Sequence, residues 1–168
     1  ALSHGKMIDM FNGLDGDGAF APTRSGAVPV GDLIRLCYSG KYATVDDMMK
    51  RAVGDAGIAA YLGTADMREV NKMIENGDEN AKLVKEAFIY QHAKDIGSLS
   101  VVMKGKVDAI LLTGGIAYGK DITDAIASYT EWIAPVVVIP GEREMIALAQ
   151  GALRVLNGEE EAKEYEAW

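Results

Sequence analysis

The sequence predicts one α/β domain, and three features indicate this. Residues 107–120 hold a continuous apolar run, then a Thr-Gly-Gly break and a helical pattern. A second run of apolar, largely β-branched residues at 135–140 precedes the last helical pattern. Short apolar runs of this kind are typical of buried parallel strands, and the helical periodicities between them predict flanking helices. The length of 168 residues is that of one ordinary domain.

Composition excludes several classes of protein. The net charge of −8 argues against a nucleic-acid surface, and the chain has no basic stripe. The single cysteine, Cys37, forms no internal disulfide and favours a reducing compartment. No apolar run approaches the roughly 20 residues needed to span a bilayer, and no signal peptide is evident. A cytoplasmic location without membrane contact is therefore expected.

The chain opens with a predicted strand followed by a long loop. Residues 7–13 predict a strand that ends in an Asn-Gly turn, with its partner strand expected upstream of this chain. The loop at 13–31 is rich in Gly, Asp and Pro and carries Arg24 among small residues. Arg24 either grips a phosphoryl or carboxylate group through its planar guanidinium or pairs with Asp15 or Asp17 on the surface.

Two helical patterns follow the loop, at 30–40 and at 44–54. Thr44 and the acids after it predict the start of the second helix. We expect Cys37 and the Met48-Met49 pair to fill the core between these helices.

The middle of the chain predicts a short helix and then the longest one. Thr64 is a candidate cap of a short helix that carries Asp66 and Arg68, which form either a plain surface ion pair or part of a pocket rim. The longest helix, at 79–103, has one broad apolar face. That predicted buried face comprises Val84, Ala87, Phe88, Gln91, Ala93, Ile96, Leu99 and Val102.

The last third predicts strand-to-helix turns at which a ligand can bind. Gly114 and Gly115 follow the first apolar run, where glycines allow close approach to a ligand or simply form a turn. Asp121 begins a helix, and a final helix follows residue 141. Glu142 and Glu144 lie in its first turn, where acids favour the helix dipole and also suit Mg²⁺ that carries a phosphate.

Four ordered motifs resemble those of the acetokinase family. They are Pro-Thr-Arg-Ser-Gly, Gly-Thr-Ala-Asp-Met-Arg-Glu-Val, Ala-Ile-Leu-Leu-Thr-Gly-Gly-Ile-Ala-Tyr-Gly and Val-Ile-Pro-Gly-Glu-Arg-Glu-Met. The resemblance covers nearly the whole chain, and residues 12–40 and 139–148 are most similar to members that act on butyrate. It implies an actin-like ATPase (ribonuclease H-like) lobe, a mixed sheet with flanking helices. It also implies phosphoryl transfer between ATP and a short-chain carboxylate.

The resemblance also implies the site residues. Arg24 is similar to the family's loop arginine, which stabilises the transferring phosphoryl group. The residues implied to contact ATP or ADP are Asp66, Met67 and Arg68 beside the adenosine, and Gly114, Gly115 and Ile116 beneath the nucleotide. Glu142 or Glu144 is implied to serve Mg²⁺.

The chain departs from the family pattern at two places. Arg143 lies between the two acids, where acetate kinases carry a continuous acidic pair. Gly-Ile-Ala-Tyr-Gly stands where acetate kinases have Gly-Ile-Gly-Glu-Asn, so Gly119 replaces the asparagine that contacts adenine.

The resemblance further implies that residues 1–168 form a carboxyl-terminal nucleotide-binding lobe, with the amino-terminal lobe as its partner. Alone, the chain is expected to be inactive, and family members associate as homo-oligomers. Two alternatives remain open at this point: a kinase for acetate, propionate or a branched acid, and a non-catalytic, actin-like nucleotide-binding module.

Overall fold

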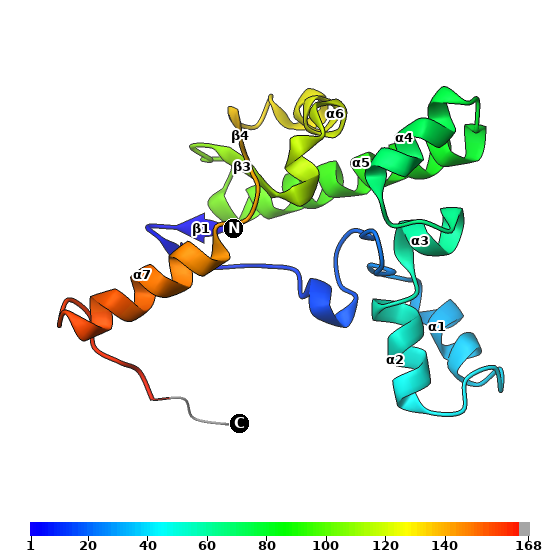
Figure 1. Cartoon of the computed structure of the whole chain (residues 1–168), viewed down its shortest axis with the longest axis horizontal. Helices are drawn as coiled ribbons and strands as arrows, with labels where there is room; N and C mark the ends of the chain where they lie inside the picture. Colours follow the sequence, from blue (N-terminus) through cyan, green and yellow to red (C-terminus); the bar gives the residue numbers. More distant parts are fainter. Residues whose placement is uncertain (165–168) are drawn as a thin grey trace.

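The computed structural model describes residues 1–164, and the long helix α5 is its central element (Figure 1). α5 (Glu79–Ser100) continues into a 3₁₀ turn, η2 (Val101–Met103), which confirms the helix predicted at 79–103. The Asp78 carboxylate begins it by accepting a hydrogen bond of 2.9 Å from the amide of Ala81. None of the helices within residues 1–164 has the length and apolar character that crossing a bilayer requires.

The amino-terminal strand pairs within the chain. β1 (Leu2–Ser3) and β2 (Lys6–Met7) form an antiparallel hairpin, followed by a 3₁₀ turn, η1 (Gly13–Asp15). Because His4 and Gly5 both have positive φ, at 50° and 74°, they make the tight two-residue turn that such a hairpin needs. The strand thus has a partner within the chain, and it ends at Met7 instead of at the predicted Asn-Gly turn.

Four helices follow: α1 (Val30–Cys37), α2 (Val45–Val53), α3 (Gly57–Leu62) and α4 (Met67–Glu75). Thr44 caps α2 as predicted, because its hydroxyl accepts from the amide of Asp47 at 3.1 Å. The expectation that Cys37 and Met49 fill a core was wrong, since both are exposed and no residue of α1 is buried. This helix pair lies at one end of the molecule, away from α5, so its apolar faces stay open (Figure 1).

The two predicted parallel strands pair in register. β3 (Ile110–Gly114) lies beside β4 (Val136–Pro140), with Ile110 opposite Val136. The predicted parallel arrangement is confirmed, but the predicted full burial is wrong, because Leu111 is 56% exposed. Leu112 packs toward α5 and α6, whereas the other face of the strands has no described cover. In residues 1–164 this pair and the hairpin are separate two-stranded sheets rather than one mixed sheet.

The turn after each strand leads into a helix. After β3 come the 3₁₀ turn η3 (Gly115–Tyr118) and α6 (Lys120–Thr130), which begins one residue before the predicted start. After β4 comes α7 (Glu144–Leu156), the predicted last helix. α7 extends away from the other helices, and none of its residues is buried (Figure 1).

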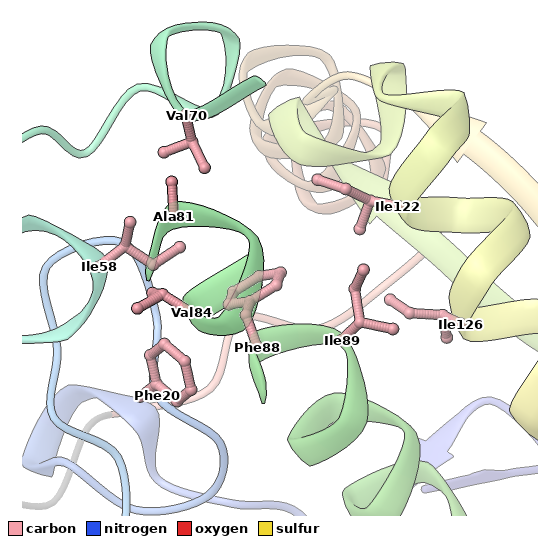
Figure 2. Packing of buried hydrophobic residues seen from close by; sticks show 9 residues of the cluster. All are labelled: Phe20, Ile58, Val70, Ala81, Val84, Phe88, Ile89, Ile122 and Ile126. Carbon is pink, nitrogen blue, oxygen red and sulfur yellow. The ribbon is translucent and has the colours of Figure 1, made fainter. Parts of the chain in front are cut away.

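The core is built on both sides of α5 (Figure 2). Phe20 of the long loop meets Phe88 edge-on, with 5.9 Å between ring centroids. Ile89, which lies outside the single face that periodicity predicted, points instead toward α6 (Figure 2). α5 is therefore buried on two sides, one facing the loop, α3 and α4, and the other facing α6. The buried cluster comprises Phe20, Ile58, Val70, Ala81, Val84, Phe88, Ile89, Ile122 and Ile126.

We predict that Phe88→Ala lowers the free energy of unfolding by about 3–5 kcal/mol, because it removes a buried ring and leaves a cavity. Leu83→Ala is the matched control on the same helix, since Leu83 is 63% exposed and its loss is expected to cost less than about 0.5 kcal/mol. Urea denaturation followed by circular dichroism measures both. Equal destabilisation by the two substitutions would contradict this core.

Candidate functional site

A surface pocket of about 550 Å³ gathers three segments that are far apart in the sequence. The first is residues 65–68 with Asn71, at the start of α4. The second is Gly115 and Ile116 with Tyr118 and Gly119, at the carboxyl end of β3. The third is the first turn of α6, which contributes Asp121 and Ile122.

The rim of the pocket at α4 is an exposed ion pair. Asp66 caps the helix by accepting from the amide of Arg68 at 2.9 Å, and its carboxylate lies 2.6 Å from the Arg68 guanidinium. The hydrogen bonds from Arg68 lower the pKa of the Asp66 carboxyl to about 2. The prediction that Thr64 caps this helix was wrong. Asp66 is the cap, and the hydroxyl of Thr64 accepts a hydrogen bond of 3.1 Å from the amide of Asp66. The two readings of this pair thus hold together: it is a surface ion pair and it borders a pocket.

The glycine turn after β3 presents bare backbone at the pocket. Gly114 has φ 86° and ψ 179°, a conformation that side chains disfavour. It exchanges two hydrogen bonds with Gly141, of 3.2 and 3.0 Å, which tie the ends of β3 and β4 together. A Cβ on Gly115 would meet no atom within 4 Å. The backbone at Gly115 is open to a ligand. Gly114, which was also predicted to lie beneath the nucleotide, is not among the residues that line the pocket.

Two helices point their amino-terminal ends at the pocket, α4 and α6. The free amides and the dipole at such an end favour a negatively charged group. The rim carries the guanidinium of Arg68, whose positive charge is balanced by its ion pair with Asp66. The pocket therefore combines several features that favour an anionic ligand.

A polar cluster of Asn71, Lys85 and Asp121 joins these two helix ends, and its members Asn71 and Asp121 line the pocket. The Lys85 ammonium forms an ion pair with Asp121 Oδ2 and donates to Asn71 Oδ1 at 2.7 Å. Asn71 Nδ2 donates in turn to Asp121 Oδ2 at 3.1 Å. Partial burial raises the pKa of the Asp121 carboxyl, but the hydrogen bond and charge of Lys85 outweigh this and hold the pKa below its ordinary value.

Sequence reasoning missed this cluster. Asp121 was recognised only as the start of a helix, and nothing marked Asn71 or Lys85. The three residues come from α4, α5 and α6, with 50 positions between Asn71 and Asp121. No local spacing joins them, so only the packing of the three helices brings them together.

Arg24 lies in a loop that is fixed against the start of α3. The carbonyls of Ala21 and Pro22 accept from the amides of Ile58 at 3.2 Å and Ala59 at 2.9 Å. The half-buried Arg24 side chain lies near Gly13, and within residues 1–164 no ion pair joins it to Asp15 or Asp17. It is not among the residues that line the pocket.

The two candidate metal ligands lie beside the pocket rather than in it. Glu142 and Glu144 are exposed, and Glu144 is the first residue of α7, but the expectation that Glu142 lies in the first turn was wrong, because it precedes the cap residue Arg143. Their turn begins at Gly141, where a Cβ would come within 2.7 Å of the Tyr118 hydroxyl, and Tyr118 lines the pocket. Among residues 1–164 no three His, Cys, Asp or Glu side chains are grouped as a metal centre.

Comparison with known proteins gives consistent relatives. The model of a family described as the acetokinase family matches residues 1–131. The chain is 54% identical over 165 residues to butyrate kinase 2 of Clostridium acetobutylicum, which covers 98% of this chain and 46% of that protein. It is 52% identical, with the same coverage, to a probable butyrate kinase of Clostridium botulinum. The chain thus spans about half the length of the curated relatives it matches.

Solved structures support the same fold. Acetate kinase of Porphyromonas gingivalis superposes with a TM-score of 0.73 at 22% identity, over 83% of this chain and 41% of that one. A propionate kinase of Francisella tularensis gives a TM-score of 0.65 at 25% identity, over 77% of this chain and 39% of that one. The fold is therefore that of part of an acetate or propionate kinase, mostly helical here with small sheets.

We predict that Gly57→Ala detaches the Arg24 loop. Gly57 has φ 61°, and a Cβ there would lie 1.9 Å from the carbonyl oxygen of Ala21. Gly63→Ala is the matched control, because Gly63 has φ 75° but open space around it, so it bears only the cost of the backbone conformation, about 1 kcal/mol. Hydrogen exchange of the amides of Ile58 and Ala59 is expected to accelerate far more in Gly57→Ala. Similar exchange in the two variants would contradict the docked loop.

Proposed function

Because the chain belongs to the acetokinase family, we propose that it forms the nucleotide-binding part of a butyrate kinase. The reaction is transfer of a phosphoryl group between ATP and butyrate. One observation carries the proposal: Asp66, Met67, Arg68, Gly115 and Ile116, selected from two separate motifs, line one pocket. In this proposal residues 1–168 are a carboxyl-terminal, actin-like lobe that works with an amino-terminal lobe.

The pocket has the chemistry of a nucleotide site. Its rim residues Asp66, Met67 and Arg68 offer apolar contact and charge for a nucleoside. The helix ends and the backbone at Gly115 favour the phosphates that follow it. In the proposed reaction a carboxylate oxygen of butyrate attacks the γ-phosphorus of ATP, an O–P bond forms, and the bond to ADP breaks.

Phosphoryl transfer needs positioning and charge neutralisation more than covalent help from the protein. Arg24 is proposed to stabilise the charge on the transferring group, since its loop is held rigidly by backbone hydrogen bonds to α3. No serine or cysteine nucleophile is required for this chemistry.

Mg²⁺ is part of the proposal, and Glu142 and Glu144 are the residues that would hold it. Mg²⁺ is commonly bound by one or two carboxylates together with water and substrate phosphates, and two exposed carboxylates beside the pocket fit that pattern. When bound, it would neutralise charge on the phosphates.

Butyrate is the substrate that we propose, because the sequence identity to the relatives named butyrate kinase is more than twice that to the acetate and propionate kinases of known structure. A cytoplasmic location and assembly into a homo-oligomer belong to the same proposal. The single Cys37 fits a reducing compartment.

We predict that this chain binds Mg·ADP in a calorimetric titration, and that Arg68→Ala weakens binding by roughly tenfold, equivalent to about 1.4 kcal/mol. Gly115→Val is expected to abolish binding by filling the space above the turn. Arg35→Ala and Gly97→Val are the matched controls. Arg35 forms a similar exposed ion pair with Asp32 at 2.6 Å, and a Cβ on Gly97 also meets no atom within 4 Å. Absence of binding in folded protein would refute the pocket assignment.

Transfer to butyrate is tested in a chimera in which this chain replaces the segment of Clostridium acetobutylicum butyrate kinase 2 that it matches. The chimera is expected to phosphorylate butyrate with a higher kcat/KM than acetate or propionate. Arg24→Ala is expected to lower kcat by about 10²–10³-fold, as removal of one charge-stabilising donor does. Arg35→Ala serves as the control. A chimera that binds Mg·ADP but leaves butyrate unphosphorylated would contradict the proposal.

A further inference from the structure

We propose that Asp121 accepts a hydrogen bond from an uncharged donor of the bound nucleoside, and that Lys85 and Asn71 position its carboxylate. The donor is either a ribose hydroxyl or the exocyclic amine of the base, which share this chemistry. The inference rests on the proposed nucleotide site and goes beyond it by naming the group that gives the site its selectivity.

The geometry leaves one carboxylate oxygen for the ligand. Oδ2 of Asp121 is held by Lys85 and Asn71, as described above. Oδ1 lies 3.1 Å from where a Cβ on Gly119 would stand, and Gly119 lines the pocket. Among residues 1–164 no side chain donates to Oδ1, and the backbone amide of Ile122 is a further donor to the carboxylate, whose two oxygens can each accept more than one hydrogen bond. The Asp121 side chain is 41% exposed, so a ligand in the pocket reaches this oxygen.

The negative charge of the Asp121 carboxylate determines which part of a nucleotide can bind beside it. An ionised carboxylate only accepts hydrogen bonds, so it disfavours phosphate and favours a hydroxyl or an amine. The lowered pKa keeps Asp121 ionised at neutral pH. The positive charge of Lys85 balances that of Asp121, so the carboxylate repels the neighbouring phosphates less. The nucleoside is thereby directed to Asp121 and to the rim residues Asp66, Met67 and Arg68, and the phosphates to the backbone at Gly115.

Lys85 and Asn71 act through Asp121. The Lys85 side chain is only 15% exposed and does not line the pocket. Its ammonium bridges Asp121 of α6 and Asn71 of α4 and so fixes the rotation of the carboxylate. A site that holds an acceptor in this way discriminates against a ligand without the donor, because the hydrogen bond from the ligand is then replaced by one from water at a carboxylate whose orientation is fixed for the ligand.

The test compares, by calorimetry, the affinities of several nucleotides for the unmodified chain and for its variants. The ligands are ADP, 2′-deoxy-ADP, 3′-deoxy-ADP and inosine diphosphate, which lacks the amine. In the unmodified chain at least one analogue is expected to bind about tenfold or more weakly than ADP. In Asp121→Ala that analogue and ADP are expected to bind equally. The analogue that loses affinity identifies the donor as sugar or base.

The controls separate a selective role from a merely structural one. Asp124→Ala removes a carboxylate of the same helix that pairs with Lys120 at 2.5 Å, and it is expected to leave the discrimination intact. Lys85→Met is expected to reduce the discrimination, and Lys85→Arg to restore it. Should Asp121→Ala fail to fold, Asp121→Asn replaces it and is expected to retain part of the discrimination.

Two results overturn the inference and remain distinguishable. If the unmodified chain binds ADP and Asp121→Ala keeps the full preference for it over every analogue, Asp121 has no selective role, and the nucleotide site stands. The same conclusion follows if ADP and all three analogues bind equally. If folded chain binds no ADP, the proposed function fails and the inference fails with it.

Discussion

The structure depends on the burial of one helix from two sides. Phe88 and Ile89 are neighbours in the sequence, yet one contacts the loop and the other faces α6 (Figure 2). Because α4 and α6 both pack on α5, their amino-terminal ends are brought to the same pocket, although they lie about 50 residues apart. Lys85, on α5 itself, then joins the two by contacting Asn71 and Asp121. Hydrophobic packing thus sets the distance between the helices, and a polar contact fixes their alignment.

Local patterns predicted the elements well and their surroundings less well. The cap at Thr44, the long helix and the two parallel strands follow from spacing and turn residues, which are visible in a few neighbouring positions. Whether an apolar face is covered depends on what packs against it. Cys37 and Leu111 lie on apolar patterns, but no described element covers them, and they are exposed. Amphipathic periodicity indicates which face can be buried and says nothing of its partner.

The site divides in the same way. Asp66, Arg68 and Gly115, which were selected from two motifs, line one pocket, and their contact with a nucleotide stays a prediction. Asn71 and Lys85 carry no such signal, since an amide or a lysine on an amphipathic helix is typical of a solvated face. The roles of Arg24 and the two glutamates stay predictions. The structure fixes the Arg24 loop on α3 and sets the turn of Glu142 against Tyr118, but none of these three side chains lines the pocket.

The ion pairs Asp66–Arg68 and Lys85–Asp121 differ in their exposure to solvent, so added salt weakens them to different extents. Asp66 and Arg68 face water, where counterions at physiological concentration screen charges beyond about 8 Å and weaken exposed pairs. The ammonium of Lys85 is largely withdrawn from solvent, so its contacts with Asp121 and Asn71 are screened much less. Raising the ionic strength therefore weakens the rim's attraction for an anion before it alters the wall of the pocket. The electrostatic attraction of a ligand to the rim and the geometry of the pocket therefore change at different ionic strengths.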